Sequence, residues 1–170
     1  MTPDLLVPLS ADGDAPPLYC VHSASGSCYT YLPLAEALDH QPVIGIEAPG
    51  YDGVEVSPAS LADLADGYAQ LVDVHRKGRP VCLLGWSMGG VVAWEMAARL
   101  RSMGCPVALL VLIEARLTDD EPIPASRMMR ARFVAGFASS TLGDMSDRIT
   151  QVLRIWADEG RTVLVSSHLL

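Results

Sequence analysis

The sequence predicts an α/β fold with a mostly parallel sheet flanked by helices. Short apolar runs alternate with longer segments of helical period, as in strand–helix–strand units. The apolar runs also lack polar alternation, which is typical of strands covered on both faces. The predicted strands are residues 17–22, 42–47, 80–85 and 106–114, and each opens with a proline. The predicted helices between them are residues 29–38, 61–76 and 88–103.

Two helix ends have recognisable signals. Ser60 is followed three residues later by Asp63, a spacing similar to a capping box at the start of the second helix. Gly104 follows the third helix, where a left-handed residue commonly ends the helical hydrogen bonding.

Length and composition limit the function classes. The chain has 170 residues, half of them apolar, and a formal net charge of −8, which indicates one domain with its own core. The longest apolar run, residues 107–113, is far shorter than the ~20 residues of a membrane span. The acidic balance argues against a nucleic-acid surface. We therefore expect neither a membrane nor a nucleic acid as partner. The first residues show no secretory signal pattern.

The cysteines are predicted to be buried free thiols. None of the four, Cys20, Cys28, Cys82 and Cys105, has CxxC spacing, and two of them lie in apolar strand runs. This usage favours a reducing, cytoplasmic location over a disulfide framework. His22 lies near Cys20, but neither has the partner spacing of a metal site, so no metal is expected.

The segment GWSMGG, residues 85–90, lies between a predicted strand and a predicted helix. A serine hydroxyl is a weak nucleophile unless it is exposed beside a base and an anion-stabilising group. A sharp strand-to-helix turn exposes Ser87 and directs the helix N-terminus at developing negative charge. The backbone N–H of Met88 would then donate to an oxyanion. The alternative is a chance GxSxG in a glycine-containing loop.

Two further segments fit the same chemistry. The loop HSASGS, residues 22–27, has small residues that leave backbone N–H groups accessible, and one of these could be a second oxyanion donor. The alternative is a flexible turn, which would have the same composition. Glu114 ends the last predicted strand, at the sheet edge where Ser87 is expected, and could orient a catalytic histidine. Alternatively, Glu114 is a solvated acid beside Arg116. Asp119 and Asp120 compete for the acid role.

In this order the motifs resemble the thioesterase domains of nonribosomal peptide synthetases and related polyketide synthases, which have the α/β-hydrolase fold. The resemblance covers residues 6 to about 114 and includes PPLYCVHSASGS, YLPLAEAL, VIGIEAPGYDG, SLADLADGY and LLGWSMGGVVAWEMA. It implies transfer of an acyl or peptidyl chain from a carrier-protein thioester to serine, then hydrolysis or cyclisation. The phosphopantetheine is carried by the partner, so no cofactor of the chain's own is implied.

The resemblance also assigns residues and regions. It makes Ser87 the nucleophile, Ala24 and Met88 the oxyanion donors, and Glu114 the acid, where the family usually has Asp. A single domain, residues 1–170, would comprise a core at 1–115, lid-like helices within 116–158 and a terminal strand at 159–170. The family's remaining strands follow the lid, so the C-terminal strands are expected to be shortened or missing.

Departures from the family pattern concern the loop and the histidine. Ser23 and Ser25 replace a proline and a glycine of the usual His-Pro-x-Gly-Gly loop. His168 alone follows the acid, in the chain order of serine, acid and histidine that this fold requires. The other histidines, His22 and the later His40 and His75, are interpreted as structural or solvated.

Other interpretations stay open. The tail ADEGRTVLVSSHLL also resembles the switch-histidine loop of ATP-binding-cassette ATPases, but no GxxxxGK[ST] segment occurs, so ATPase activity is not expected. A stand-alone editing thioesterase, or a truncated fragment that binds acyl chains or carrier protein without turnover, would share these motifs. A basic cluster in the segment SRMMRAR is a candidate docking surface for an acidic carrier protein, or else a solvated lid face; it comprises Arg127, Arg130 and Arg132.

Overall fold

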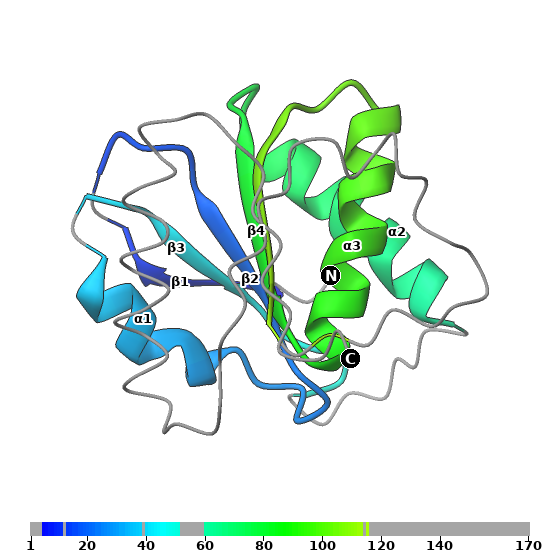
Figure 1. Cartoon of the computed structure of the whole chain (residues 1–170), viewed down its shortest axis with the longest axis horizontal. Helices are drawn as coiled ribbons and strands as arrows, with labels where there is room; N and C mark the ends of the chain where they lie inside the picture. Colours follow the sequence, from blue (N-terminus) through cyan, green and yellow to red (C-terminus); the bar gives the residue numbers. More distant parts are fainter. Residues whose placement is uncertain (1–4, 12, 39, 52–59, 114, 116–170) are drawn as a thin grey trace, which may run out of the picture.

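A five-stranded sheet forms the centre of the described part of the chain (Figure 1). The computed structural model describes residues 5–11, 13–38, 40–51, 60–113 and 115. The strand order is β1-β3-β2-β4-β5, with parallel pairing throughout except between β1 and β3. The strands are β1 (Leu6–Ser10), β2 (Leu18–Val21), β3 (Val43–Ile46), β4 (Val81–Trp86) and β5 (Val107–Ile113). This arrangement confirms the predicted mostly parallel sheet and all four predicted strands.

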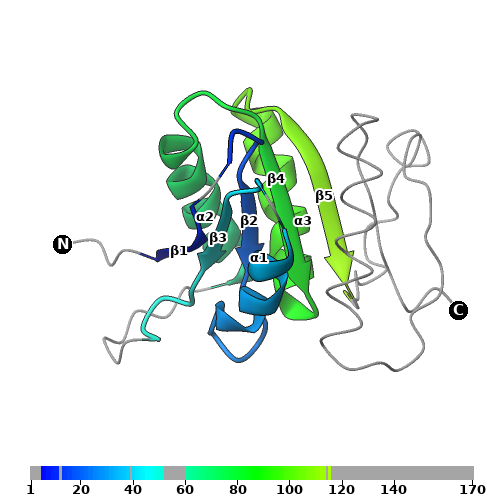
Figure 2. The same ribbon diagram turned by 90° about the vertical axis from the view of Figure 1, so that its left-hand side faces the viewer.

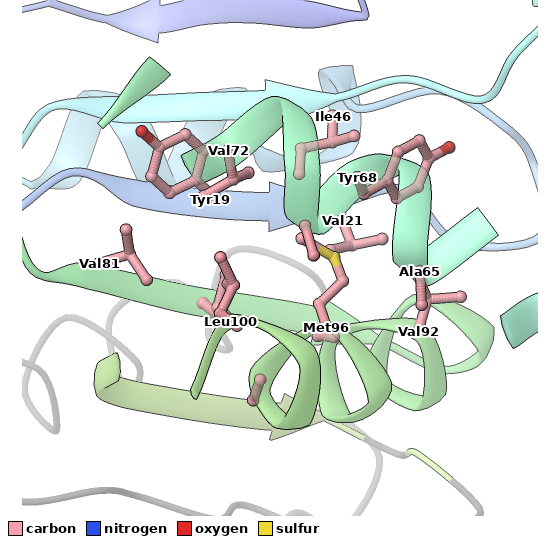
Figure 3. Packing of buried hydrophobic residues seen from close by; sticks show 14 of the residues in the cluster. Tyr19, Val21, Ile46, Ala65, Tyr68, Val72, Val81, Val92, Met96 and Leu100 are labelled. Atoms are coloured by element: carbon pink, nitrogen blue, oxygen red, sulfur yellow. The ribbon is translucent and has the colours of Figure 1, made fainter. Parts of the chain in front are cut away.

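Helices cover both faces of the sheet (Figure 2). A 3-10 turn (Tyr29–Tyr31) and α1 (Leu32–Ala37) lie on one face, and α2 (Leu61–His75) and α3 (Met88–Ser102) lie on the other. Alternate residues of β2 serve the two layers. Tyr19 and Val21 pack with α2 and α3 (Figure 3). Leu18 and Cys20 pack with α1. Two-sided burial therefore explains why the strands are apolar without alternation.

Strand β1 is an addition to the predicted strands. Its sequence LVPLS contains Pro8, which lacks the N–H that a central strand needs for its ladder. The strand lies at the edge of the sheet, and its register with β3 shifts between Pro8 and Ser10. An edge position tolerates proline because one side of the strand has no neighbour to bond.

The predicted helix at residues 29–38 is shorter than expected. A 3-10 turn occupies residues 29–31, and the α-helix begins only at Leu32. A helix starting at Tyr29 would need the N–H of residue 33 to bond the Tyr29 carbonyl. Residue 33 is proline, which has no N–H and fits only the first turn of an α-helix. The proline therefore fixes the start of α1.

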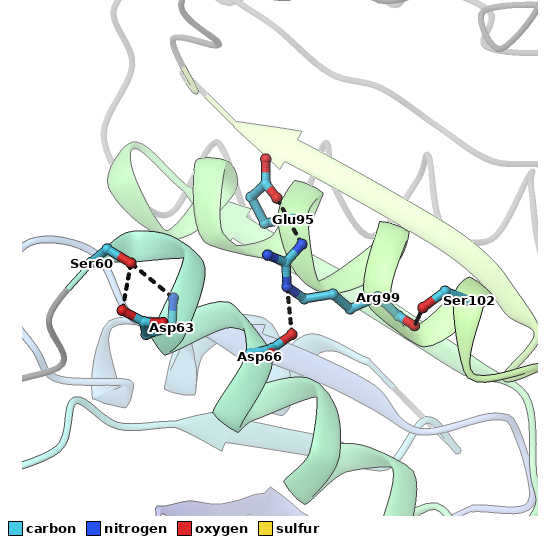
Figure 4. A network of polar contacts seen from close by, with 6 residues as sticks. All are labelled: Ser60, Asp63, Asp66, Glu95, Arg99 and Ser102. Carbon is cyan, nitrogen blue, oxygen red and sulfur yellow. Dashed lines mark hydrogen bonds and ion pairs between the residues drawn. The ribbon is translucent and has the colours of Figure 1, made fainter.

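The predicted cap of α2 is confirmed (Figure 4). The Asp63 N–H donates to Ser60 Oγ at 3.1 Å, and the Ser60 hydroxyl donates to Asp63 Oδ2 at 2.7 Å. One turn further on, α2 meets α3 through Arg99, whose Nε lies 2.6 Å from Asp66 Oδ1 and whose Nη1 lies 3.0 Å from Glu95 Oε2. These groups are partly exposed, so such pairs contribute at most about 1 kcal/mol each.

The predicted end of α3 at Gly104 is confirmed as well. Gly104 has φ +79°, and its N–H donates to the Arg101 carbonyl at 3.0 Å. The next N–H, of Cys105, donates to the Leu100 carbonyl at 2.8 Å. These two bonds form a Schellman motif, which satisfies carbonyls that the helix end would otherwise leave unbonded.

All four cysteines are buried and free, as predicted. Burial raises the pKa of the Cys82 thiol to about 12. Burial and the Glu47 carboxylate together raise the pKa of the Cys28 thiol to about 11. Both therefore stay protonated at neutral pH and serve as small apolar side chains. Within the described ranges, no helix is long and apolar enough to cross a membrane. The predicted lid helices, terminal strand and basic cluster fall outside the described residues.

Two glycine substitutions should have opposite effects on stability. A Cβ on Gly104 or on Gly67 in α2 would have no other atom within 4 Å, so a steric clash would not contribute to the stability change of either substitution. Gly104→Ala forces alanine into a left-handed conformation and should lower the free energy of unfolding by about 1 kcal/mol. Gly67→Ala should raise it by about 0.5–1 kcal/mol, because glycine is a poor helix former. Urea denaturation checks both, and equal signs would contradict the assigned role of Gly104.

Candidate active site

Ser87 occupies the turn between β4 and α3. It is exposed, and its backbone has φ 56° and ψ −122°, outside the regions that L-residues normally adopt. Such a conformation costs about 1–3 kcal/mol and persists only where the surroundings impose it. The Ser87 N–H donates to the Ile113 carbonyl at the end of β5 (2.8 Å), and its carbonyl accepts from Gly90 N–H (3.0 Å). The turn is therefore held from both sides.

Close backbone packing enforces this turn. A Cβ on Gly85 would overlap the Gly89 carbonyl, so the strand and the helix pass with no room for side chains. A Cβ on Gly89 would overlap the His22 carbonyl and come within 2.5 Å of the Val21 carbonyl. The glycines two residues before and two residues after Ser87 therefore let the strand and the helix pass this closely. This packing also places the first turn of α3 directly against the end of β2.

The loop after β2 is a hydrogen-bonded turn rather than a loose segment. Gly26, at φ +81°, donates its N–H to the Ser23 carbonyl at 3.0 Å and accepts from the Ala48 N–H at 2.9 Å. The hydroxyls of Ser23 and Ser25 lie 3.1 Å apart. The two serines that replace a proline and a glycine therefore bond each other. Ala24 is exposed at the tip of this turn.

The predicted oxyanion donors lie on the two segments that Gly89 brings together. Met88 begins α3, where the first backbone N–H groups have no intrahelical acceptor. Ala24 lies two residues beyond His22. Within the described ranges, neither N–H makes a turn, loop or cap hydrogen bond. Both N–H groups belong to segments at the carboxyl edge of the sheet, beside the Ser87 turn.

His22 is a structural residue, as interpreted. It is buried, with Nδ1 2.7 Å from the Ser23 carbonyl and Nε2 2.8 Å from the Tyr68 hydroxyl. The Tyr68 hydroxyl lies 3.0 Å from the Glu47 carbonyl. Burial lowers the pKa of His22, so the neutral form is favoured at neutral pH. Its ring ties the loop to α2 through the Tyr68 hydroxyl.

The other two early histidines lie in different settings. His75 ends α2, and its Nδ1 is 2.9 Å from the Tyr19 hydroxyl. His40 is exposed with φ 63°. Both fit the structural or solvated interpretation. The described ranges contain no group of three or more His, Cys, Asp or Glu side chains that could hold a metal.

The predicted acid and base lie beyond the described residues. This applies to Glu114 and His168, and to the competing acids Asp119 and Asp120. The described residue before Glu114 is Ile113, whose carbonyl accepts the Ser87 N–H.

Tyr31 contacts the ends of the two strands that lead to the candidate site, which its sequence context did not indicate. Its hydroxyl donates to the Val21 carbonyl at 2.7 Å and accepts from the Trp86 N–H at 3.0 Å. These partners lie 10 and 55 residues away along the chain. The one available signal was a tyrosine within an apolar stretch.

The sequence is similar to parts of known peptide synthetases. The chain is 40% identical over 114 residues to a dimodular nonribosomal peptide synthase of Bacillus subtilis, covering 66% of the chain and 5% of that protein. It is 30% identical over 179 residues to enterobactin synthase component F of Escherichia coli K12, covering 97% of the chain and 14% of that protein. The chain thus spans only a small fraction of these relatives.

Solved structures agree on the fold. The thioesterase domain of NocB, from the nocardicin cluster, superposes with a TM-score of 0.66 at 23% identity, covering 95% of this chain and 75% of that one. The type II thioesterase YbtT superposes with a TM-score of 0.59 at 21% identity, covering 89% and 57%. Both support the α/β-hydrolase architecture. Residues 16–148 match the thioesterase domain family, and the chain belongs to that family.

Proposed function

We propose that the chain is a serine thioesterase that releases an acyl or peptidyl chain from the phosphopantetheine thioester of a carrier protein. The observation that carries the proposal is Ser87, exposed at a strained turn between β4 and α3. Backbone strain at one serine, enforced by the packing of Gly85 and Gly89, is typical of a nucleophile elbow. Family membership supports a thioester as the substrate.

In the proposed acylation, Ser87 Oγ attacks the thioester carbonyl carbon. A carbon–oxygen bond forms while a base takes the hydroxyl proton. The carbonyl oxygen becomes an oxyanion, and the N–H groups of Ala24 and Met88 donate to it. The carbon–sulfur bond then breaks, and the phosphopantetheine thiol leaves with the proton. The product is an acyl-serine.

The second half of the reaction removes the acyl group from Ser87. Water attacks the ester in hydrolysis, and a hydroxyl or amine of the bound chain attacks it in cyclisation. The same base takes the proton of the attacking group and returns it to Ser87 Oγ. We assign the base to His168 and its orientation to Glu114, because only this histidine follows the acid in the chain.

Replacing the nucleophile should abolish turnover. Ser87→Ala removes the attacking oxygen, so hydrolysis of a small acyl thioester should fall by about 10⁴-fold or more. A fluorophosphonate should label the wild-type chain at Ser87 and leave this variant unlabelled. Ser102→Ala, at another exposed serine, is the matched control and should keep both activities. Multiple turnovers by Ser87→Ala near the wild-type rate would contradict the assignment.

The assignment of His168 predicts strong non-additivity. A serine without its base keeps only what binding and the oxyanion donors provide. His168→Ala should therefore reduce kcat nearly as much as Ser87→Ala, and the double variant should be no slower than either single variant. His40→Ala, at an exposed histidine, should retain wild-type kcat. Full activity in His168→Ala would exclude it from the reaction.

The carrier protein is proposed to dock through the basic cluster. Charge reversal at Arg130 and Arg132 should raise KM for a carrier-bound substrate several-fold by weakening electrostatic attraction to acidic helices. KM for a small thioester should not change. Reversal at the exposed Lys77 and Arg101 changes the net charge equally and is the matched control. Equal effects on both substrates, or in both double variants, would remove the docking role.

A further inference from the structure

We infer that Tyr31 is a positioning residue whose hydroxyl sets the separation of the two strand ends that lead to the oxyanion donors. The inference rests on the proposed function, because it concerns how Ala24 and Met88 are held for one oxyanion. Its structural basis is the hydrogen-bonded bridge from Val21 through Tyr31 to Trp86.

The bridge occupies the point where the β2–β4 ladder stops. The two strands pair in regular parallel register from Leu18 to Val21, and the last pair is Val21 with Gly85. The next N–H, of Trp86, donates to the Tyr31 oxygen rather than to a strand carbonyl. Two hydrogen bonds in series hold the Trp86 N–H and the Val21 carbonyl farther apart than one direct bond of about 2.9 Å would. The phenol oxygen therefore separates the strand ends.

Both bonds have only one possible direction. The Val21 carbonyl can only accept, so the phenol must donate its single proton there, and the Trp86 N–H can only donate, to the phenol oxygen. Burial strongly raises the pKa of Tyr31, so the hydroxyl keeps the proton that this arrangement needs. The hydroxyl therefore both donates and accepts within the main chain.

The two bridged groups lie next to the proposed oxyanion donors. Val21 is the last residue of β2, and the loop that carries Ala24 follows it. Trp86 is the last residue of β4, and Met88 comes two residues later. On the other side of Val21, Gly89 of α3 packs against the same backbone. The end of β2 is thus fixed between the Tyr31 hydroxyl on one side and the first turn of α3 on the other.

The test is Tyr31→Phe in the full chain, assayed with a small acyl thioester. The variant keeps the buried ring and loses the hydroxyl, so the Trp86 N–H and the Val21 carbonyl both lose this partner and the strand ends are no longer held at a fixed separation. Small misplacement of groups that act only in the transition state lowers kcat far more than it changes KM. We expect kcat and the fluorophosphonate labelling rate of Ser87 to fall by about 10- to 100-fold. KM should stay within about twofold of the wild type.

Tyr19→Phe is the matched control. Tyr19 is also buried, and its hydroxyl bonds His75 Nδ1 at 2.9 Å, at the end of α2 and not at the Ser87 turn. It should lose a similar amount of thermal stability while kcat stays at the wild-type value. If both variants lose kcat equally, the effect is general destabilisation and the positioning role is wrong. Wild-type kcat in Tyr31→Phe would also overturn it.

Amide hydrogen exchange at Trp86 tests the bridge without activity. The Trp86 N–H should exchange faster in Tyr31→Phe and at the wild-type rate in Tyr19→Phe. Unchanged exchange in Tyr31→Phe would contradict the bridge. If the wild-type chain neither labels nor turns over thioester, the proposed function fails, and the exchange result still decides the bridge.

Discussion

The structure around Ser87 depends on one constraint, the approach of three backbone segments with no side chains between them. The end of β2, the end of β4 and the first turn of α3 meet at Gly85 and Gly89, where a Cβ would overlap a neighbouring carbonyl. The cost of the strained Ser87 backbone is offset by the packing of the layers on either side. The exposed serine is thus a consequence of the core rather than of its own loop.

Hydrogen bonds from buried polar side chains hold in place the backbone segments that Gly85 and Gly89 allow to come close. Tyr31 joins β2 to β4 from the α1 side, and His22 with Tyr68 joins the following loop to α2. All three side chains are buried; Tyr31 and His22 each bond a backbone carbonyl, and Tyr68 bonds His22. A buried hydroxyl or imidazole left without its partner would cost about 1–3 kcal/mol. These bonds therefore favour a single geometry for the loop and the turn, as a site that stabilises charge in a transition state requires.

Tyr31 and Tyr68 show that the tyrosines here have separate roles. Tyr68 bonds a histidine that the sequence had already singled out, whereas the partners of the Tyr31 hydroxyl among the described residues are main-chain groups. Every residue has a backbone carbonyl, so the residue type of a main-chain partner does not reveal that a side chain bonds to it. For that reason, a bridge of this kind is visible only in three dimensions.

Local patterns determined four of the five described strands, the capping of α2 by Ser60, the end of α3 at Gly104 and the turn at Ser87, because each depends on residues within a few positions. The sequence did not predict the edge strand β1 or the late start of α1. Pro8 is tolerated in β1 because the strand lies at the edge of the sheet, and Pro33 prevents an α-helix from beginning at Tyr29 because it has no N–H. Only the tertiary structure decided that Gly89 would meet Val21 and that Tyr31 would join two strands. Those contacts link residues far apart in the chain, and no local preference encodes which backbone group a buried hydroxyl will reach.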